Sequence, residues 1–250
     1  MMVNIAICGA NGKMGQMVHS CTLERDDINV VCGVDVNTNT YADFPIYEKI
    51  SMINEKVDVI IDYSHPSALN DILNYALSNG VAVIFATTGY SAQQIADIKK
   101  AALQIPVFFT FNMSLGINLL CALAKKATEV LGNQFDIEIV EKHHNLKIDA
   151  PSGTAIMLAN AINETLDNKM YCEYDRHSKR EKRKPNEIGM HSVRGGTIVG
   201  EHEIIFAGKD EVISLKHEAH SKQVFATGSL NAAVFLKGKS AGLYDMSAIV

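Results

Sequence analysis

The sequence predicts an α/β fold made of a parallel-sheet domain and an α+β domain with a mixed sheet. Three observations support this prediction. Short apolar runs alternate with segments of helical periodicity between residues 3 and 131, which is typical of parallel strands joined by helices. Three glycines fill the turn between the first apolar run and the first helical segment, G-A-N-G-K-M-G. From residue 135 onward, longer strand-like runs accompany a single helical segment.

The composition excludes several classes of protein. A chain of 250 residues forms one large domain or two small ones, and 47% hydrophobic with 20% charged residues is ordinary for a soluble globular protein. A formal net charge of −5 argues against a nucleic-acid partner. No apolar run is long enough to span a membrane, and no signal-peptide pattern opens the chain. The five cysteines are odd in number and lack metal-site spacing, so we expect no metal and a reducing, cytoplasmic compartment.

The glycine-rich turn predicts a dinucleotide site. Residues 3–8 form a short apolar strand, a helical run follows the glycines, and a second strand over residues 28–34 ends at Asp35. In such a unit the glycines admit a pyrophosphate at the helix start, and the acidic residue accepts hydrogen bonds from ribose hydroxyls. The spacing is G-x-x-G-x-x-G rather than G-x-G-x-x-G. Taken alone, it is equally consistent with a plain strand-to-helix turn.

Three further strands of the first domain each end in small or polar residues. We expect these strands at residues 57–63, 81–86 and 107–110, with one helix capped by Ser67 and another over residues 91–102. Ligands bind at the carboxyl ends of parallel strands, although ordinary turn chemistry explains the same residues. We leave His65 out of the site because a His-Pro pair at a strand end is more often a turn.

Residues 139–155 hold the densest cluster of reactive side chains. Adjacent His143 and His144 follow a strand, Lys147 comes shortly after, and Ser152-Gly153-Thr154 opens an apolar-periodic helix. Ser152 is a plausible N-cap, and the unpaired N–H groups and dipole at a helix start favour anions. Each feature alone is as well explained by a surface histidine pair or a simple cap. Together they indicate a site where a carboxylate binds and a proton is delivered.

The rest of the chain supplies a long helix, several strands and a last helix. We expect a helix over residues 114–131. Residues 171–188 are polar, and we expect the basic run within them, residues 176–184, to be a solvated loop. Strands at 197–202, 203–207 and 211–219 would form the mixed sheet, and a helix over 224–236 would follow.

The segment 141–155 resembles the signature of the 4-hydroxy-tetrahydrodipicolinate reductase (dihydrodipicolinate reductase) family, E-x-H-H-x-x-K-x-D-x-P-S-G-T-A. The matching residues are Glu141, His143, His144, Lys147, Asp149, Pro151, Ser152, Gly153, Thr154 and Ala155. The glycine turn is similar to the family's G-x-x-G-x-M-G, and residues 188–202 and the tail 242–246 also resemble the family. The resemblance therefore covers essentially the whole chain.

The resemblance implies a Rossmann-like dinucleotide-binding domain, residues 1–114 and 224–250, and a substrate-binding and oligomerisation domain, residues 115–223. It implies reduction of (2S,4S)-4-hydroxy-2,3,4,5-tetrahydrodipicolinate to (S)-2,3,4,5-tetrahydrodipicolinate with loss of water, in lysine and diaminopimelate synthesis. The implied cofactor is NADH or NADPH, the implied partner is a cyclic dicarboxylate substrate, and the implied assembly is a homotetramer.

The resemblance also implies a role for each site residue. His143 would donate the proton and Lys147 would be the second catalytic residue. The substrate carboxylates would bind at His144, Ser152, Gly153 and Thr154. The cofactor would bind at Gly9, Ala10, Asn11, Gly12, Lys13, Met14, Asp35, Ala86, Thr87, Thr88, Thr110, Phe111, Asn112 and Met113. The family usually has glycine where Ala86 stands.

Two other functions remain open. A different Rossmann dehydrogenase would lack the H-H-x-x-K and P-S-G-T elements. A nonenzymatic nucleotide sensor would have no reason to keep His143 and Lys147 beside an anion-binding helix start.

The residues around Asp35 predict the cofactor preference. The three residues that follow Asp35, V-N-T, include no cation, and a carboxylate at this position repels a 2′-phosphate. With Lys13 as the one nearby cation, we predict use of both cofactors, with NADH slightly preferred.

Overall fold

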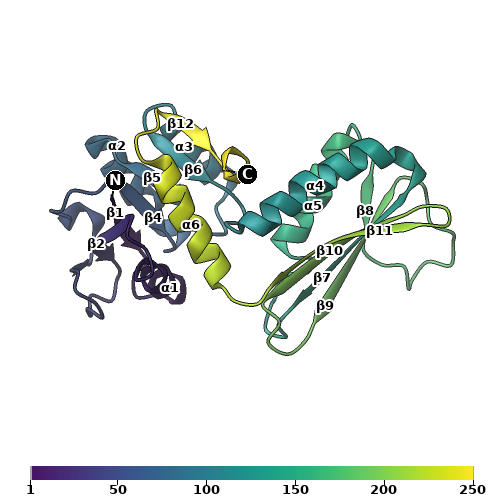
Figure 1. The fold of residues 1–250 in the computed structure, drawn as a ribbon, viewed down its shortest axis with the longest axis horizontal. Helices are drawn as coiled ribbons and strands as arrows, with labels where there is room; N and C mark the ends of the chain where they lie inside the picture. Colours follow the sequence, from purple (N-terminus) through teal and green to yellow (C-terminus); the bar gives the residue numbers. More distant parts are fainter. Residues whose placement is uncertain (1, 250) are drawn as a thin grey trace. The chain divides into compact units, whose positions relative to one another are not determined.

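The computed structural model describes residues 2–249 and contains two compact units (Figure 1). Unit 1 consists of Met1–Leu115 and Lys222–Val250, and unit 2 consists of Gly116–Ser221. The C-terminal helix and strand therefore return to the unit in which the chain begins.

Unit 1 is built on a seven-stranded sheet in the order β12-β6-β5-β4-β1-β2-β3. Every neighbouring pair is parallel, which confirms the predicted Rossmann-like sheet. The strands are β1 Val3–Cys8, β2 Ile28–Val34, β3 Ile46–Tyr47, β4 Val59–Asp62, β5 Ala82–Phe85, β6 Pro106–Phe109 and β12 Gly242–Tyr244. The two-residue β3 and the C-terminal β12 were not predicted.

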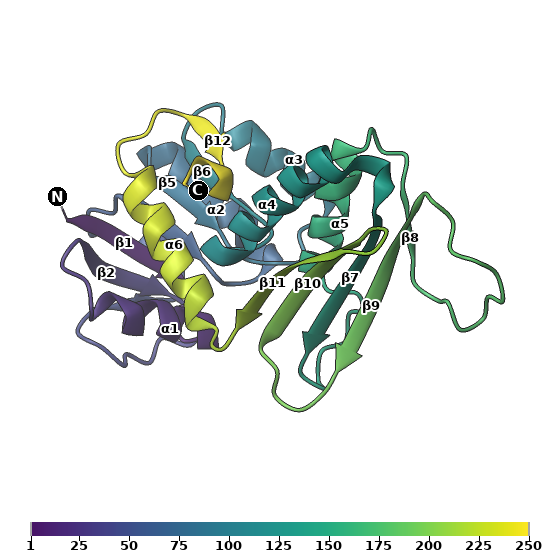
Figure 2. The same ribbon diagram turned by 45° about the vertical axis from the view of Figure 1, so that its right-hand side comes forward.

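Helices cover both faces of this sheet, as Figure 2 shows. Successive residues of β1 alternate between two cores: Ile5 and Ile7 pack with the last helix, whereas Ala6 and Cys8 pack with Ile72 and its neighbours. Burial on both faces explains why these strands are almost wholly apolar. The helices are α1 Lys13–Thr22, α2 Leu69–Asn79, α3 Ala92–Ala101 and α6 Gln223–Leu236, with short 3-10 turns η1 Ile50–Met52, η2 Pro66–Ala68 and η4 Met246–Ala248.

Unit 2 is a five-stranded mixed sheet with two helices packed on one face. The sheet order is β11-β10-β7-β9-β8, and β7 pairs parallel with β9 and antiparallel with β10. Apolar side chains of α4 and α5 pack on Ile137, Ile139 and Phe206 of the sheet. The elements are α4 Leu115–Leu131, η3 Gly132–Gln134, β7 Asp136–His143, α5 Gly153–Thr165, β8 Tyr171–Glu173, β9 Glu187–Arg194, β10 Gly200–Ala207 and β11 Val212–Ala219.

One strand prediction for unit 2 was wrong. The two strands expected at 197–202 and 203–207 are the single strand β10, because its alternation of buried and half-buried residues runs through the junction without a turn. The basic run 176–184 is a mostly exposed loop, as predicted, and it lies between β8 and β9, neither of which was predicted. Arg183 is its most buried charged side chain among those that form ion pairs, 16% exposed and paired with Asp136 and Glu138.

In unit 1, the predicted Ser67 cap of α2 was wrong. His65 instead caps the 3-10 turn η2, because its Nδ1 accepts a hydrogen bond from the Ser67 amide at 3.2 Å. A 3-10 turn then precedes α2, which begins at Leu69 without a side-chain cap.

Candidate active site

Glu141 is a buried carboxylate at the centre of the unit 2 site. It lies on the same face of β7 as Ile137 and Ile139, so the strand places it toward the core, and its side chain is 1% exposed. Its Oε1 accepts hydrogen bonds from Arg194 Nη2 at 2.7 Å and from the Ser152 amide at 3.2 Å. Its Oε2 contacts Arg194 Nη1 at 2.9 Å and His143 Nδ1 at 2.5 Å.

These donors keep Glu141 ionised. Burial acts to raise the pKa of the carboxyl, but hydrogen bonds from Arg194, Ser192 and His143 outweigh it and lower the pKa to about 2. The bidentate arginine contact is the strongest of these interactions in general. The site therefore has a fixed negative charge that is almost fully withdrawn from solvent.

His143 is held between this carboxylate and a second imidazole. Its ring packs edge to face against His202, with 5.2 Å between the ring centres. Burial lowers the pKa of His143, Glu141 acts to raise it, and the positive charges of Lys147 and Arg194 lower it further. On the Nε2 side the ring lies against the backbone of Gly200, where a Cβ atom would approach Nε2 to 3.2 Å.

Ser152 starts helix α5, as predicted from its position. Its Oγ accepts a hydrogen bond from the Ala155 amide at 3.2 Å and pairs with His202 Nε2 at 2.9 Å, which confirms the N-cap. Gly153 follows on the surface, and no atom lies within 4 Å of the place where its Cβ would be. The helix start therefore leaves open space next to Gly153, with Thr154 as the next residue of the first turn.

The loop between His143 and Ser152 carries the remaining predicted residues of this unit. Lys147 pairs with Asp149 at 2.8 Å and its side chain is 21% exposed. Arg194 Nη2 also donates to the Asp149 carbonyl at 2.6 Å, so the same arginine braces the loop. His144 is half-buried, and its Nδ1 has no hydrogen-bond partner among the residues that the structure describes. His143 and Ser152 thus both hydrogen-bond to Glu141. Lys147 lies close enough for its charge to act on His143.

Arg194 and His202 belong to this cluster but were not predicted as site residues. The burial of His202, which is 4% exposed, lowers its pKa to about 4, so the imidazole is neutral at neutral pH. The alternation of residues along the strand could have indicated that His202 points inward, because the inward positions of this strand are Gly200, His202, Ile204 and Phe206. Arg194 had a weaker signal, a charged residue at the end of an apolar strand and before two glycines.

In unit 1, the glycine turn follows β1 as predicted. Gly9 adopts a φ of +77°, and a Cβ there would lie 2.6 Å from the Tyr63 carbonyl oxygen. A Cβ at Gly15 would lie 2.2 Å from the Gly9 carbonyl oxygen. Only glycine fits these two positions, because larger residues would separate the turn from β4 and from the first turn of α1.

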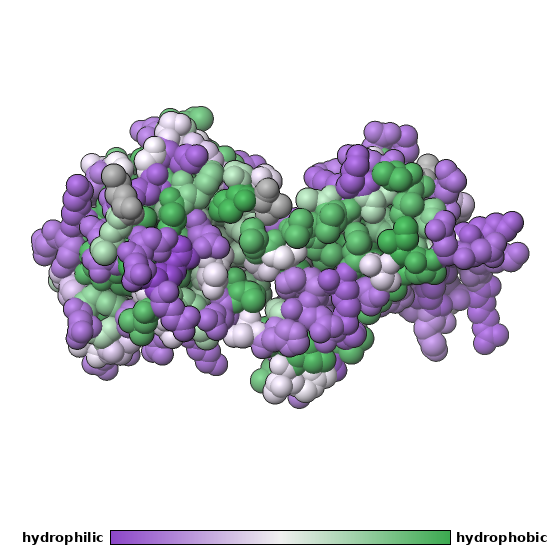
Figure 3. Space-filling view, in the orientation of Figure 1, coloured by the Kyte–Doolittle hydropathy of each residue, from purple (hydrophilic) through white to green (hydrophobic). Residues whose placement is uncertain are grey.

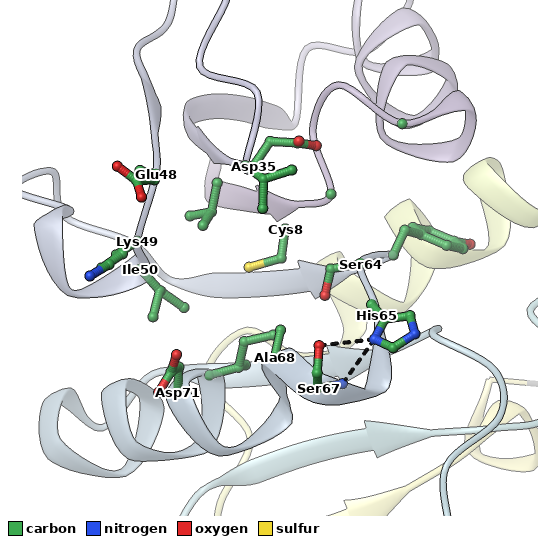
Figure 4. A pocket seen from close by; sticks show the side chains of 16 residues that line it. Cys8, Asp35, Glu48, Lys49, Ile50, Ser64, His65, Ser67, Ala68 and Asp71 are labelled. Atoms are coloured by element: carbon green, nitrogen blue, oxygen red, sulfur yellow. Dashed lines mark hydrogen bonds between the residues drawn. The ribbon is translucent and has the colours of Figure 1, made fainter.

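A cavity of about 360 Å³ lies at the carboxyl ends of β1, β2 and β4 (Figure 4). Gly9, Gly12 and Asp35 line it, together with His65, which was not predicted to belong to the site. Asp35 is fixed there because its two oxygens accept hydrogen bonds from the Asn11 amide at 2.9 Å and the Asn37 amide at 3.0 Å. Lys13 is exposed at the start of α1 and is not among the lining residues.

The other predicted cofactor residues follow two neighbouring strands, β5 and β6. Segment 86–88 is tied to β4 by the Ala86 amide, which donates to the Asp62 carbonyl at 3.0 Å. Segment 110–113 is a polar turn in which Phe111 is 69% exposed and Met113 is buried. Neither segment lines the cavity beside Asp35.

Comparison with known sequences decides the family. The family profile described as "Dihydrodipicolinate reductase, N-terminus" matches residues 3–113, and its C-terminal counterpart matches residues 116–250. The chain belongs to the dihydrodipicolinate reductase family. It is 50% identical to the 4-hydroxy-tetrahydrodipicolinate reductase of Caldanaerobacter subterraneus subsp. tengcongensis, across 100% of this chain and 99% of that one. The reductase of Clostridium tetani is 44% identical, across 100% of this chain and 98% of its own.

Solved structures agree with the predicted fold. A dipicolinate-bound dihydrodipicolinate reductase from Paenisporosarcina sp. TG-14 superimposes with a TM-score of 0.82 at 24% identity, covering 100% of both chains. A myo-inositol dehydrogenase from Corynebacterium glutamicum gives a TM-score of 0.59 at 11% identity, covering 97% of this chain and 90% of its own. At these identities the likeness concerns the fold. The predicted family and fold class are both confirmed.

Within residues 2–249, no helix combines the length and the apolar character needed to cross a membrane. In the same part of the chain, no group of three or more His, Cys, Asp or Glu side chains is arranged to hold a metal ion.

Proposed function

We propose that this member of the dihydrodipicolinate reductase family reduces (2S,4S)-4-hydroxy-2,3,4,5-tetrahydrodipicolinate to (S)-2,3,4,5-tetrahydrodipicolinate, with loss of water, in lysine and diaminopimelate synthesis. The observation that carries the proposal is the full-length match, at 50% identity, to a relative named for this substrate. The cluster of His143, Ser152 and Lys147 in unit 2 supports it, as does the solved relative that is bound to dipicolinate, a cyclic dicarboxylate.

Unit 1 has the features that NADH or NADPH requires. The glycine turn admits no side chain at Gly9, its backbone starts helix α1, and Asp35 lies in the adjoining cavity. A pyrophosphate at the helix start and a ribose at Asp35 match these features. We infer that Gly9 to Met14 hold the phosphates, and that segments 86–88 and 110–113 hold the nicotinamide half. When bound, the reduced nicotinamide supplies the hydride.

Unit 2 supplies the acid and the anion site. Addition of a hydride to the conjugated ring leaves negative charge, which the His143 imidazolium quenches with its proton. The Lys147 ammonium offsets the same charge or that of a carboxylate. We infer that the substrate carboxylates bind at the open start of α5, near Gly153 and Thr154, with His144 as a further donor and Ser152 as the cap that holds the helix start.

A coupled assay tests this proposal. The purified protein is given reduced nicotinamide together with the aldol product of pyruvate and aspartate semialdehyde, and nicotinamide absorbance is followed. We expect absorbance loss only when the aldol product is present. Nicotinamide binding without any turnover would favour the nucleotide sensor, and turnover with another small acid alone would favour a different dehydrogenase.

We also propose that the protein is a cytoplasmic homotetramer that assembles through the open face of the unit 2 sheet. Helices α4 and α5 cover one face (Figure 2), whereas Val140, Val193 and Ile205 point to the other. Further apolar surface lies on α4, where Leu119 and Leu123 are exposed, and Figure 3 shows a hydrophobic area over this helix. Apolar areas of this kind mark interaction surfaces. Light scattering that gave a monomer mass at micromolar concentration would contradict this assembly.

A further inference from the structure

We propose that Glu141 is a positioning residue that makes Nε2 of His143 the proton-delivering nitrogen, and that Arg194 balances the charge of Glu141. The inference rests on the proposed function in one respect, that His143 is the proton donor. It goes further because it assigns the reacting nitrogen and gives opposite electrostatic roles to two residues that do not touch the substrate in the proposal above.

The hydrogen bonds of Glu141 determine the tautomer of His143. An ionised carboxylate accepts hydrogen bonds and donates none, and Arg194 keeps Glu141 ionised through two contacts at 2.7 and 2.9 Å. The nitrogen at 2.5 Å from Oε2 is Nδ1 of His143, so Nδ1 keeps its hydrogen in both protonation states of the ring. The proton that the ring gains and loses is therefore on Nε2.

The same carboxylate joins the proton donor to the helix start. Its Oε1 accepts from the Ser152 amide at 3.2 Å, and Ser152 caps α5 beside the proposed carboxylate site. Three separate elements, β7, β9 and the start of α5, thus meet on one side chain that is 1% exposed. A group held from three directions can keep His143 and the helix start in a fixed relation.

Charged groups from three elements act on the His143 ring. Glu141 of β7 is an anion, whereas Arg194 of β9 and Lys147 of the loop after β7 are cations. His202 of β10 packs against the ring and is neutral near neutral pH. Coulomb's law then gives opposite signs: removing the charge of Glu141 disfavours the imidazolium, whereas removing the charge of Arg194 favours it.

The Glu141→Gln change should also reverse the tautomer. Arg194 and the Ser152 amide can only donate to Oε1, whereas His143 Nδ1 at Oε2 can become an acceptor, so the glutamine oxygen should take the place of Oε1 and leave its NH₂ group facing His143. An NH₂ group donates to Nδ1, and Nε2 would then carry the hydrogen of the neutral ring. In Arg194→Gln the carboxylate remains, so Nδ1 should keep its hydrogen.

The test is an NMR titration of substrate-free protein with isotope-labelled histidine rings, in the wild type, Glu141→Gln and Arg194→Gln. The protein has nine histidines, and the His143 signal is identified by its loss in His143→Gln. We expect the pKa of His143 to fall in Glu141→Gln and to rise in Arg194→Gln. Ring-carbon shifts should show the Nδ1–H tautomer in the wild type and the Nε2–H tautomer in Glu141→Gln.

Shifts of the same sign in both variants, or a wild-type Nε2–H tautomer, would overturn the inference. If Glu141→Gln fails to fold, the upward shift in Arg194→Gln and the wild-type tautomer still decide it. The titration needs no turnover, so its outcome is separate from the coupled assay of the proposed function. Where turnover is present, the pH above which kcat declines should move with the titrated pKa in each variant.

Discussion

His143 and Lys147 differ in what holds them, although the same short motif contains both. The imidazole contacts a buried carboxylate and a second imidazole, whereas the ammonium has one half-exposed partner, Asp149. This contrast suits an acid that needs fixed geometry and a cation that acts through charge. Both residues lie in unit 2, so each can be substituted without disturbing unit 1.

We expect His143→Gln and Lys147→Ala each to lower kcat by about 10²-fold or more, the scale of a lost general acid or charge stabiliser. The Kd for NADH should not change, because neither residue belongs to the unit that contains the glycine turn. Steady-state kinetics and calorimetric titration of NADH measure the two quantities. A variant that keeps near-normal kcat would remove that residue from the mechanism.

Gly200 offers a test of the space at His143 Nε2. A Cβ at position 200 would lie 3.2 Å from Nε2, so Gly200→Ala should push the ring out of position and lower kcat by about 10-fold or more, as small misplacements of reacting groups do. Gly195→Ala is the matched control, because no atom lies within 4 Å of its Cβ position. Equal kcat values for the two variants would show that Nε2 does not require the present position of the ring.

Asp35 decides the expected cofactor preference. Two backbone amides fix its carboxylate at the cavity wall, where it accepts from a ribose 2′-hydroxyl and repels a 2′-phosphate. Lys13 is exposed and does not line the cavity, so we predict use of both cofactors with NADH ahead by a small factor. Lys13→Ala should raise KM for NADPH and leave that for NADH unchanged. A tenfold preference for NADPH in kcat/KM, about 1.4 kcal/mol, would contradict this interpretation of Asp35.

At the scale of whole elements, local patterns were predictable and long-range pairings were not. The glycine turn, β1 and the Ser152 cap depend on neighbouring residues, so sequence spacing was sufficient to place them. The Arg194–Glu141 contact depends on the register that sets Glu141 beside Ser192 and His143 beside Arg194. That register joins strands about fifty residues apart, and β9 begins in a polar stretch where no strand was predicted.

Helix α6 carries the next prediction, because it packs closely on the segment proposed to hold the nicotinamide. A Cβ at Gly228 would lie 1.8 Å from the Met113 carbonyl oxygen. Gly228→Ala must therefore move the helix or the 110–113 turn, at a cost of about 1–3 kcal/mol in the free energy of unfolding. We expect a lower melting temperature and a higher KM for NADH. Val234→Ala on the exposed side of the same helix is the control, and an unchanged KM in Gly228→Ala would separate α6 from cofactor binding.

For the molecule as a whole, the buried groups of unit 2 predict how stability depends on pH. The pKa of His202 is about 4 in the folded chain, because burial opposes protonation, against an ordinary value of 6.5. Between these two values the unfolded chain binds more protons than the folded chain, so the free energy of unfolding falls as pH falls. Glu141, with a folded pKa of about 2, acts with the same sign but below its ordinary value of 4.5. The two groups therefore affect different pH windows.

The contribution of His202 to the pH dependence of stability can be measured by substitution. Its linkage makes the wild type lose about 2 kcal/mol of unfolding free energy between about pH 7 and about pH 5, which urea unfolding followed at both pH values measures. His202→Asn should reduce this pH-dependent loss, whatever it does to stability at pH 7, because the proton-linked group is gone. His220→Asn is the matched control, since the His220 side chain is 88% exposed and its change should leave the pH dependence as in the wild type. If His202→Asn kept the full wild-type loss, the acid sensitivity would have to arise from other groups, such as His143 or His217, whose pKa values burial also lowers.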